Sequence, residues 1–163
     1  MIELNRDILL TMDDHALSGM CEISFCKGSG PGGQKRNKTS SAVQLHLRGT
    51  EISAGDCTER SQIRNRSNAL KKLKMQIAMK YRLPRTEAPE HMECSMNSDY
   101  YALFAAQLLD IIEQCSFDHR KTAEICGISP SALLKKIYRD PLLWQFFQAE
   151  RKLFGLPELQ SPK

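Results

Sequence analysis

CEISFCKGSGPGGQKRNKTSSAVQLHLR, residues 21–48, consists of two alternating segments separated by a glycine-rich interruption. Apolar and polar side chains alternate over residues 21–27 and again over residues 42–48, which predicts two half-buried β-strands. Between them, four glycines and a proline fall within residues 28–33. Residues 28–38 are therefore predicted to form a loop in which several positions are free to take positive φ angles.

After this stretch, the sequence predicts first a turn and then a helix. Residues 52–57 are predicted to turn at Ala54-Gly55, with short extended arms on either side. Residues 61–82 have helical periodicity, and Ser61 is a suitable N-cap. The apolar stripe of this helix consists of Leu70, Leu73 and Ile77.

The C-terminal half is predicted to be helical. Helices are expected over residues 99–114, over residues 118–127, from Ser129-Pro130 to a break at Asp140-Pro141, and from there to about Phe154, with Gly155 just past the end. The predicted domains are residues 1–83, a linker over residues 84–98, and a helical module over residues 99–163. The expected fold class is α+β: a small sheet of three or four mostly antiparallel strands, the 61–82 helix across one face, then the all-helical C-terminal module.

Basic charge is confined to the middle third of the 163-residue chain, which has a net charge of +4. Residues 27–82 hold thirteen basic and three acidic side chains, a net charge of +10, whereas residues 1–26 carry −4 and residues 83–163 carry −2. A confined basic field indicates a polyanionic partner, most often nucleic acid. A solvated basic helix without a partner is the alternative.

The sequence also excludes several classes of protein. No apolar stretch approaches the ~20 residues needed to cross a bilayer, and the N-terminus has no signal-peptide core. A cytoplasmic monomer is expected, or a protein that reaches an organelle by another route. The six cysteines are scattered without a C-x-x-C pair, so we expect reduced thiols, no metal site and no cofactor.

Two common glycine-loop motifs do not fit the interruption. Gly28, Gly30 and Gly33 have the spacing of a dinucleotide fingerprint, but the next strand begins too soon for the crossover helix that this motif requires. Gly28 and Gly33 also fit the glycine spacing of a P-loop. There the required Lys followed by Ser or Thr is replaced by Gln34 and Lys35, so the magnesium-binding hydroxyl is missing.

The stretch from Gly28 to Thr39, GSGPGGQKRNKT, resembles the GGQ loop of class I peptide-chain release factors and of the small ribosome-rescue hydrolases related to them. A second segment is similar to another signature of that family: Glu59-Arg60-Ser61-Gln62, followed by Asn65-Arg66 and Ala69-Leu70. Together the two segments mark a region of resemblance over about residues 20–82. The spacing between them makes the resemblance specific, whereas a lone Gly-Gly-Gln triplet would carry no weight.

The resemblance implies ribosome-dependent, codon-independent hydrolysis of peptidyl-tRNA, with Gly32, Gly33 and Gln34 as the catalytic tip. The partners it implies are the large-subunit rRNA at the peptidyl-transferase centre and the peptidyl-tRNA. RNA contacts are expected from Lys27, Ser29, Lys35, Arg36, Asn37, Lys38, Arg60, Ser61, Gln62, Arg64, Arg66, Lys71, Lys72 and Lys74. For Arg60, an ion pair with an acidic group of its own domain is the alternative.

The sequence departs from the family pattern in three places. Arg36 stands where many members carry valine. Only about 20 residues precede the first strand, so a stop-codon-reading domain is not expected. Residues 155–163 do not resemble the strongly basic tail of many small rescue factors.

The C-terminal half leaves a second function open. Residues 122–136 have the pattern of a helix-turn-helix, with a small residue, a glycine at the turn and a capped second helix. The basic residues of that helix are Lys135, Lys136 and Arg139. The alternative function is therefore a ribosome- or nucleic-acid-binding regulator with a vestigial GGQ loop. A helical packing module is the simpler interpretation of this half.

Overall fold

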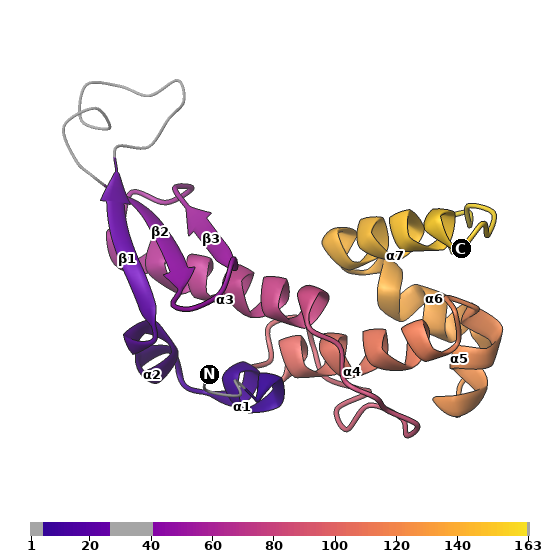
Figure 1. Cartoon of the computed structure of the whole chain (residues 1–163). Coiled ribbons are helices and arrows are strands. Elements are labelled where there is room, and N and C mark those ends of the chain that lie inside the picture. Colours follow the sequence, from indigo (N-terminus) through magenta and orange to yellow (C-terminus); the bar gives the residue numbers. More distant parts are fainter. Residues whose placement is uncertain (1–4, 27–40, 163) are drawn as a thin grey trace. The chain divides into compact units, whose positions relative to one another are not determined.

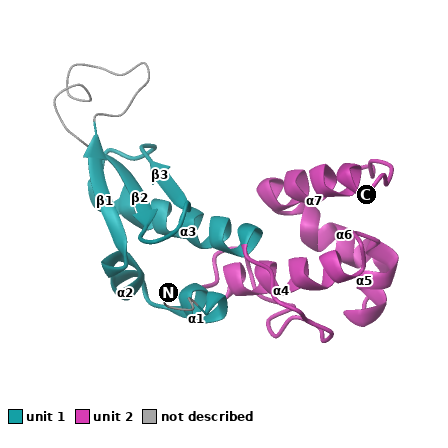
Figure 2. Ribbon diagram, viewed as in Figure 1, with its two compact units in different colours: residues 1–80 teal, residues 81–163 magenta. Residues whose placement is uncertain are grey.

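The computed structural model describes residues 5–26 and 41–162 (Figure 1). The chain divides into two compact units, Met1–Lys80 and Tyr81–Lys163 (Figure 2). The first unit contains a small sheet and three helices among its described residues, and the second contains four helices. The predicted α+β class, with a helical C-terminal part, is therefore confirmed.

The sheet of the first unit has three antiparallel strands in the order β1-β2-β3. They are β1 (Cys21–Cys26), β2 (Ala42–Leu47) and β3 (Ser53–Asp56). The first two confirm the alternating patterns, and their register pairs Cys21 with Leu47 and Cys26 with Ala42. Val43, Leu45 and Leu47 are all buried, so one face of β2 belongs to the core.

The predicted turn at Ala54-Gly55 is wrong, because both residues lie inside β3. Ala54 pairs with Leu45 of β2 and is itself buried, while Gly55 pairs with Gln44. The chain turns earlier, where Gly49 takes a φ of +73° between β2 and β3. At Gly55 a side chain would press against the backbone, since an added Cβ would lie 3.1 Å from the carbonyl oxygen of Val43.

Helix α3 (Gln62–Lys80) packs on β2 and β3 and closes the core of the first unit. Ser61 caps it as predicted, because its Oγ accepts from the backbone N–H of Arg64 at 3.4 Å. Two short helices precede the sheet: α1 (Arg6–Thr11) and α2 (Asp14–Gly19). Neither helix is predicted from the sequence, since a helix of six residues is too short for a periodic pattern to emerge.

The second unit contains the predicted helices. They are α4 (Tyr101–Gln114), α5 (His119–Ile125), α6 (Pro130–Tyr138) and α7 (Pro141–Leu153). Asp118, Ser129 and Asp140 cap the last three with side-chain oxygens. Proline occupies the first position of both α6 and α7, where its missing N–H costs nothing.

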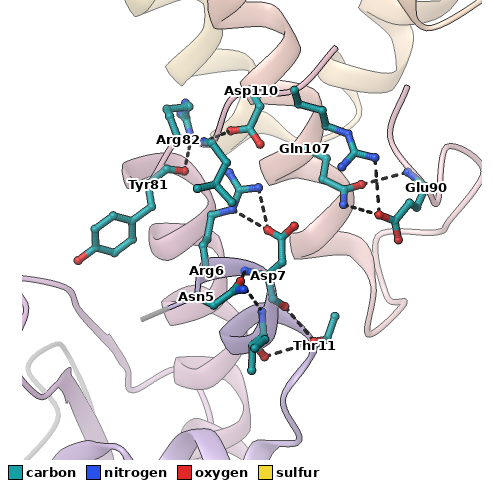
Figure 3. Close-up of polar contacts among 12 residues, drawn as sticks. Asn5, Arg6, Asp7, Thr11, Tyr81, Arg82, Glu90, Gln107 and Asp110 are labelled. Carbon is teal, nitrogen blue, oxygen red and sulfur yellow. Dashed lines mark hydrogen bonds and ion pairs between the residues drawn. The ribbon is translucent and has the colours of Figure 1, made fainter. Parts of the chain in front are cut away.

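Residues 83–98 lie in the second unit without forming a helix or a strand. They are nevertheless bonded to α4: the backbone N–H of Leu83 donates to Asp110 Oδ1 at 3.0 Å. Glu90 and Gln107 exchange two hydrogen bonds of 3.0 Å each (Figure 3). Within residues 5–26 and 41–162, no helix combines the length and hydrophobicity needed to span a bilayer.

Candidate functional site

The predicted catalytic residues Gly32, Gly33 and Gln34 lie outside the described residues. The same holds for the predicted RNA contacts Lys27, Ser29, Lys35, Arg36, Asn37 and Lys38. The structure does describe the base of this segment. Cys26 and Ala42 form the last pair of the β1–β2 ladder, so the two strand ends that flank residues 27–40 are held opposite each other.

Asn65 joins this base to the start of α3. Its side chain is fully buried, on the first turn of the helix. The amide Nδ2 donates to the carbonyl oxygen of Ser41 at 2.7 Å and to that of Glu59 at 2.9 Å, and Oδ1 accepts from the N–H of Glu59 at 2.8 Å. The residue that precedes β2 and the turn before α3 are therefore tied together by one side chain.

Asp56, at the end of β3, forms a second polar cluster against α3. Lys72 donates to Oδ1 at 2.6 Å, while Thr58 Oγ1 and Asn68 Nδ2 donate to Oδ2 at 2.8 and 3.1 Å. Burial alone would raise the pKa of Asp56. The hydrogen bonds from Lys72, Thr58 and Asn68 outweigh that effect and lower its pKa to about 2. Lys72 is thus the counter-ion of a buried carboxylate.

Arg66 and Lys74 contact the N-terminal helices of their own unit. Arg66 donates to Ser18 Oγ through Nε at 3.1 Å and Nη2 at 2.5 Å. Lys74 Nζ donates to the carbonyl oxygen of Met12 at 2.8 Å and lies 3.4 Å from Asp14 Oδ1. Together with Lys72, these are three predicted RNA-binding cations that hold elements of the first unit together.

Arg60, Arg64 and Lys71 are exposed to solvent. Arg64 and Lys71 are seven residues apart and so share one face of α3. The Arg64 side chain is 75% exposed, and its only ion pair within the described chain is a long one of 3.8 Å to Glu59. No ion pair joins Arg60 or Lys71 to the residues that the structure describes. Gln62 is likewise exposed, at the first position of the helix.

The cations of α6 are mostly turned inward. Lys136 Nζ donates to the carbonyl oxygen of Met92 and to Glu93 Oε1, both at 2.9 Å. Arg139 donates to the carbonyl oxygen of Cys94 at 3.0 Å, and its guanidinium lies 5.4 Å from the centre of the Tyr101 ring. Only Lys135 is exposed. Helix α6 therefore lacks the exposed cationic face that a nucleic-acid-binding helix-turn-helix would use.

The role of Asn65 was not predicted from the sequence, although this residue lies in the second signature. A signal was present, because Asn65, Ala69, Leu73 and Ile77 are spaced by four residues and form one buried face of α3. A polar residue on such a face predicts a buried hydrogen-bond network. Its partners, two backbone carbonyls and one N–H, have no sequence signature.

No group of three metal-ligating side chains occurs in the described parts of the chain. The six cysteines are free thiols. Burial is the main reason that the pKa of Cys21 is raised above its ordinary value and that of Cys126 is raised to about 11, so both remain protonated at neutral pH. Neither is suited to act as a nucleophile.

Comparison with known proteins identifies the family. The model of the RF-1 domain matches residues 15–101, which is more than half of the chain. The chain belongs to the RF-1 domain family, that of the class I peptide-chain release factors. The match includes both signature segments, and with them the residues that Asn65 connects.

Curated relatives of this RF-1 domain are release factors from bacteria. Peptide chain release factor 2 of Campylobacter hominis is 33% identical over 97 residues, which cover 60% of this chain and 25% of that protein. Peptide chain release factor 1 of Bifidobacterium longum is 38% identical over 78 residues, covering 47% and 22%. That of Geobacter metallireducens is 48% identical over 56 residues, covering 34% and 16%. The alignments thus span a quarter or less of these relatives. No solved structure matches the chain significantly.

Proposed function

We propose that this RF-1 domain protein hydrolyses the ester of peptidyl-tRNA on the ribosome and releases the nascent chain without reading a codon. The observation that carries the proposal is the family match across residues 15–101, which contains Gly32-Gly33-Gln34 together with the second signature. Asn65, within that second signature, is bonded to the base of the segment that bears the glycines, which supports a functional connection between the two.

The chemistry needs no side-chain nucleophile, since water attacks the ester carbon. The protein has to supply a donor for the developing oxyanion and a site in which that water is ordered. Glycines at positions 32 and 33 allow the backbone to approach the reacting carbon closely. The uncharged amide of Gln34 can both donate and accept a hydrogen bond, without adding negative charge beside the oxyanion. Ribosomal RNA and the tRNA complete the site, and no cofactor is required.

Attachment to ribosomal RNA is assigned to the exposed cations. Arg60, Arg64 and Lys71 are exposed, and residues 27–38 add four further basic residues in the sequence. Phosphate contacts of this kind position a protein without reading sequence, and they make its affinity dependent on salt. The protein is proposed to act as a monomer, in the cytoplasm or in an organelle that has ribosomes.

Codon independence is supported by the charge of the second unit. Reading a codon requires contact with single-stranded mRNA, and such contacts use cationic or aromatic surfaces. The second unit, residues 81–163, carries a net charge of −1, and two of the three basic residues at α6, Lys136 and Arg139, are bonded within the unit. This unit is proposed to be a packing module and not a decoding module.

The test measures the release of labelled peptide from purified ribosomal complexes with a stop codon, a sense codon or a truncated mRNA in the A site. Wild type is compared with Gln34→Ala. We expect release from the truncated-mRNA complex, and a loss on the order of 100-fold in the variant, comparable to removing an oxyanion donor. Release at stop codons alone would overturn codon independence. No release from any complex would overturn the hydrolase proposal.

A further inference from the structure

The buried amide of Asn65, in the second signature, is bonded to Ser41 and Glu59. Ser41 is the first described residue after residues 27–40 and the last one before β2. Glu59 is the first residue of the second signature. Asn65 contacts the backbone of both, with three hydrogen bonds between 2.7 and 2.9 Å. One side chain thereby connects Ser41 with α3, although Ser41 and Asn65 are 24 residues apart in the sequence.

The geometry requires an amide at this position. Nδ2 donates to two carbonyl oxygens, and Oδ1 accepts from one N–H, so three of the four hydrogen-bonding capacities of the side chain are used. A carboxylate of the same shape would face the two carbonyls without a proton to donate. An apolar residue would leave the carbonyls of Ser41 and Glu59 and one N–H without this partner, in a place where water has no access to the side chain.

The contacts also distinguish Asn65 from a residue that serves only packing. Ala69, Leu73 and Ile77 on the same buried face hold α3 against the sheet through apolar surface. Asn65 adds little apolar area, and its bonds all go to backbone atoms of Ser41 and Glu59. Its effect is to fix where the chain enters β2 relative to the start of α3.

We propose that Asn65 is a positioning residue for release: it holds the C-terminal base of the segment that bears Gly32-Gly33-Gln34 at a fixed place relative to the start of α3. The inference rests on the proposed hydrolysis by that tip. Asn65 does not touch the substrate. It acts through Ser41, and its loss lowers the rate at which bound protein reacts, not the affinity of the exposed cations for RNA.

The test compares Asn65→Asp and Asn65→Ala with Ile77→Ala. The first variant keeps the shape and removes the donors; the second removes the side chain without adding charge. Ile77→Ala weakens the same buried face about three turns further along α3, without touching Ser41 or Glu59. Peptide release is measured against protein concentration, and rates are normalised to the folded fraction.

We expect both Asn65 variants to lower the release rate at saturation on the order of 100-fold, as a displacement of about 1 Å of a reacting group can. The concentration for half-maximal release should change less than about threefold, because binding rests on other residues. Normalised Ile77→Ala should retain the wild-type rate. If the Asn65 variants retain it as well, the positioning role is overturned.

A second measurement separates this inference from the proposed function. Backbone amide NMR signals of Gly32, Gly33 and Ser41 are compared between wild type, Asn65→Ala and Ile77→Ala, without ribosomes. Shifts in Asn65→Ala that are absent from Ile77→Ala support the positioning role, and their absence overturns it. Failure of wild type to release peptide would overturn the hydrolase proposal alone, since the NMR comparison does not depend on activity.

Discussion

Helices α3 and α6 look alike in sequence and differ in what their cations do. Both begin after a capping serine, and both carry lysines and arginines in excess over acidic residues. Around α3 the cations are divided by their bonding: Arg66, Lys72 and Lys74 are bonded within the unit. Arg60 and Lys71 are exposed without an ion pair to the described residues, and exposed Arg64 has only a long one. At α6, Lys136 and Arg139 are bonded inward and Lys135 alone is exposed.

A count of basic residues therefore does not identify a nucleic-acid-binding surface. Long cationic side chains find partners in backbone carbonyls of their own unit, as Lys74 does at Met12, Lys136 at Met92 and Arg139 at Cys94. Such carbonyls carry no sequence signal. Three exposed cations at or just before α3 lack a close partner in the described chain, against one on α6, and the assignment of ribosome binding depends on that difference.

The largest expected effect comes from removing the exposed cations Arg60, Arg64 and Lys71, which lie just before α3 or on it. We expect the triple variant Arg60→Gln, Arg64→Gln, Lys71→Gln to bind ribosomes on the order of 100-fold more weakly at physiological salt. The slope of log affinity against log salt should fall by about 2 to 3, because each phosphate contact contributes about 0.7 to 0.9. Ribosome sedimentation at several salt concentrations measures both quantities.

Lys135→Gln on α6 is the matched control for the triple variant. It also removes an exposed charge from a basic helix, but we expect unchanged affinity and slope. Thermal stability should be near wild type in both proteins, since surface substitutions away from bonded groups have small effects. Equal losses of affinity from the two helices would contradict the distinction drawn between them.

The sequence predicted the regular elements better than the roles of the charges. Strand alternation, the Ser129 cap and the Asp140-Pro141 break all correspond to local physical rules, and the structure confirms them. The turn at Ala54-Gly55 was wrong because glycine also permits close strand approach, and local sequence does not distinguish the two uses.

The inward roles of Arg66 and Lys74 could not be predicted for a different reason. Their partners, Ser18, Met12 and Asp14, lie in or next to α2, an element too short to be detected from periodicity. The role of Lys72 depends on Asp56 at the end of β3, a strand in which the sequence predicts a turn at Ala54-Gly55 instead. In each case, the partner of the cation lies in or next to an element that the sequence does not predict.

Neighbouring lysines on α3 allow a sharper test, in which Lys72→Met is compared with Lys71→Met. Lys72 is paired with buried Asp56, whose pKa is lowered from its ordinary 3.8 to about 2. That shift corresponds to about 2 kcal/mol of folding free energy. We expect Lys72→Met to lose a large part of that at pH 7, since Thr58 and Asn68 still hold the carboxylate, and Lys71→Met to stay within about 0.5 kcal/mol of wild type.

The pH dependence follows from the sign of the shift. Because the pKa of Asp56 is lower in the folded protein, its carboxylate stabilises the fold above about pH 4, and this contribution is lost as the pH falls from about 4 to about 2. The difference between wild type and Lys72→Met should therefore shrink on acidification. Urea unfolding at pH 7 and pH 3 measures it, and a constant difference would show that Lys72 acts through packing instead.

The smallest effect is expected at α6, where Arg139→Met is compared with Lys135→Met. Arg139 donates to the carbonyl oxygen of Cys94, and its guanidinium lies over the rings of Tyr101 and Phe104. Methionine keeps the packing of the side-chain stem and removes both polar interactions, which contribute about 1 to 2 kcal/mol together. In the wild type, the stabilisation from these two interactions is partly offset, because Arg139 Nε is buried without a partner.

We expect Arg139→Met to lower the free energy of unfolding by about 1 kcal/mol, and Lys135→Met to change it by less than about 0.5 kcal/mol. Neither should alter ribosome affinity, because one cation is already bonded within its unit and the other is isolated on an acidic module. A loss of affinity in Lys135→Met would make α6 an RNA-binding helix after all. A loss in Arg139→Met alone would instead indicate that the fold of the second unit matters for binding.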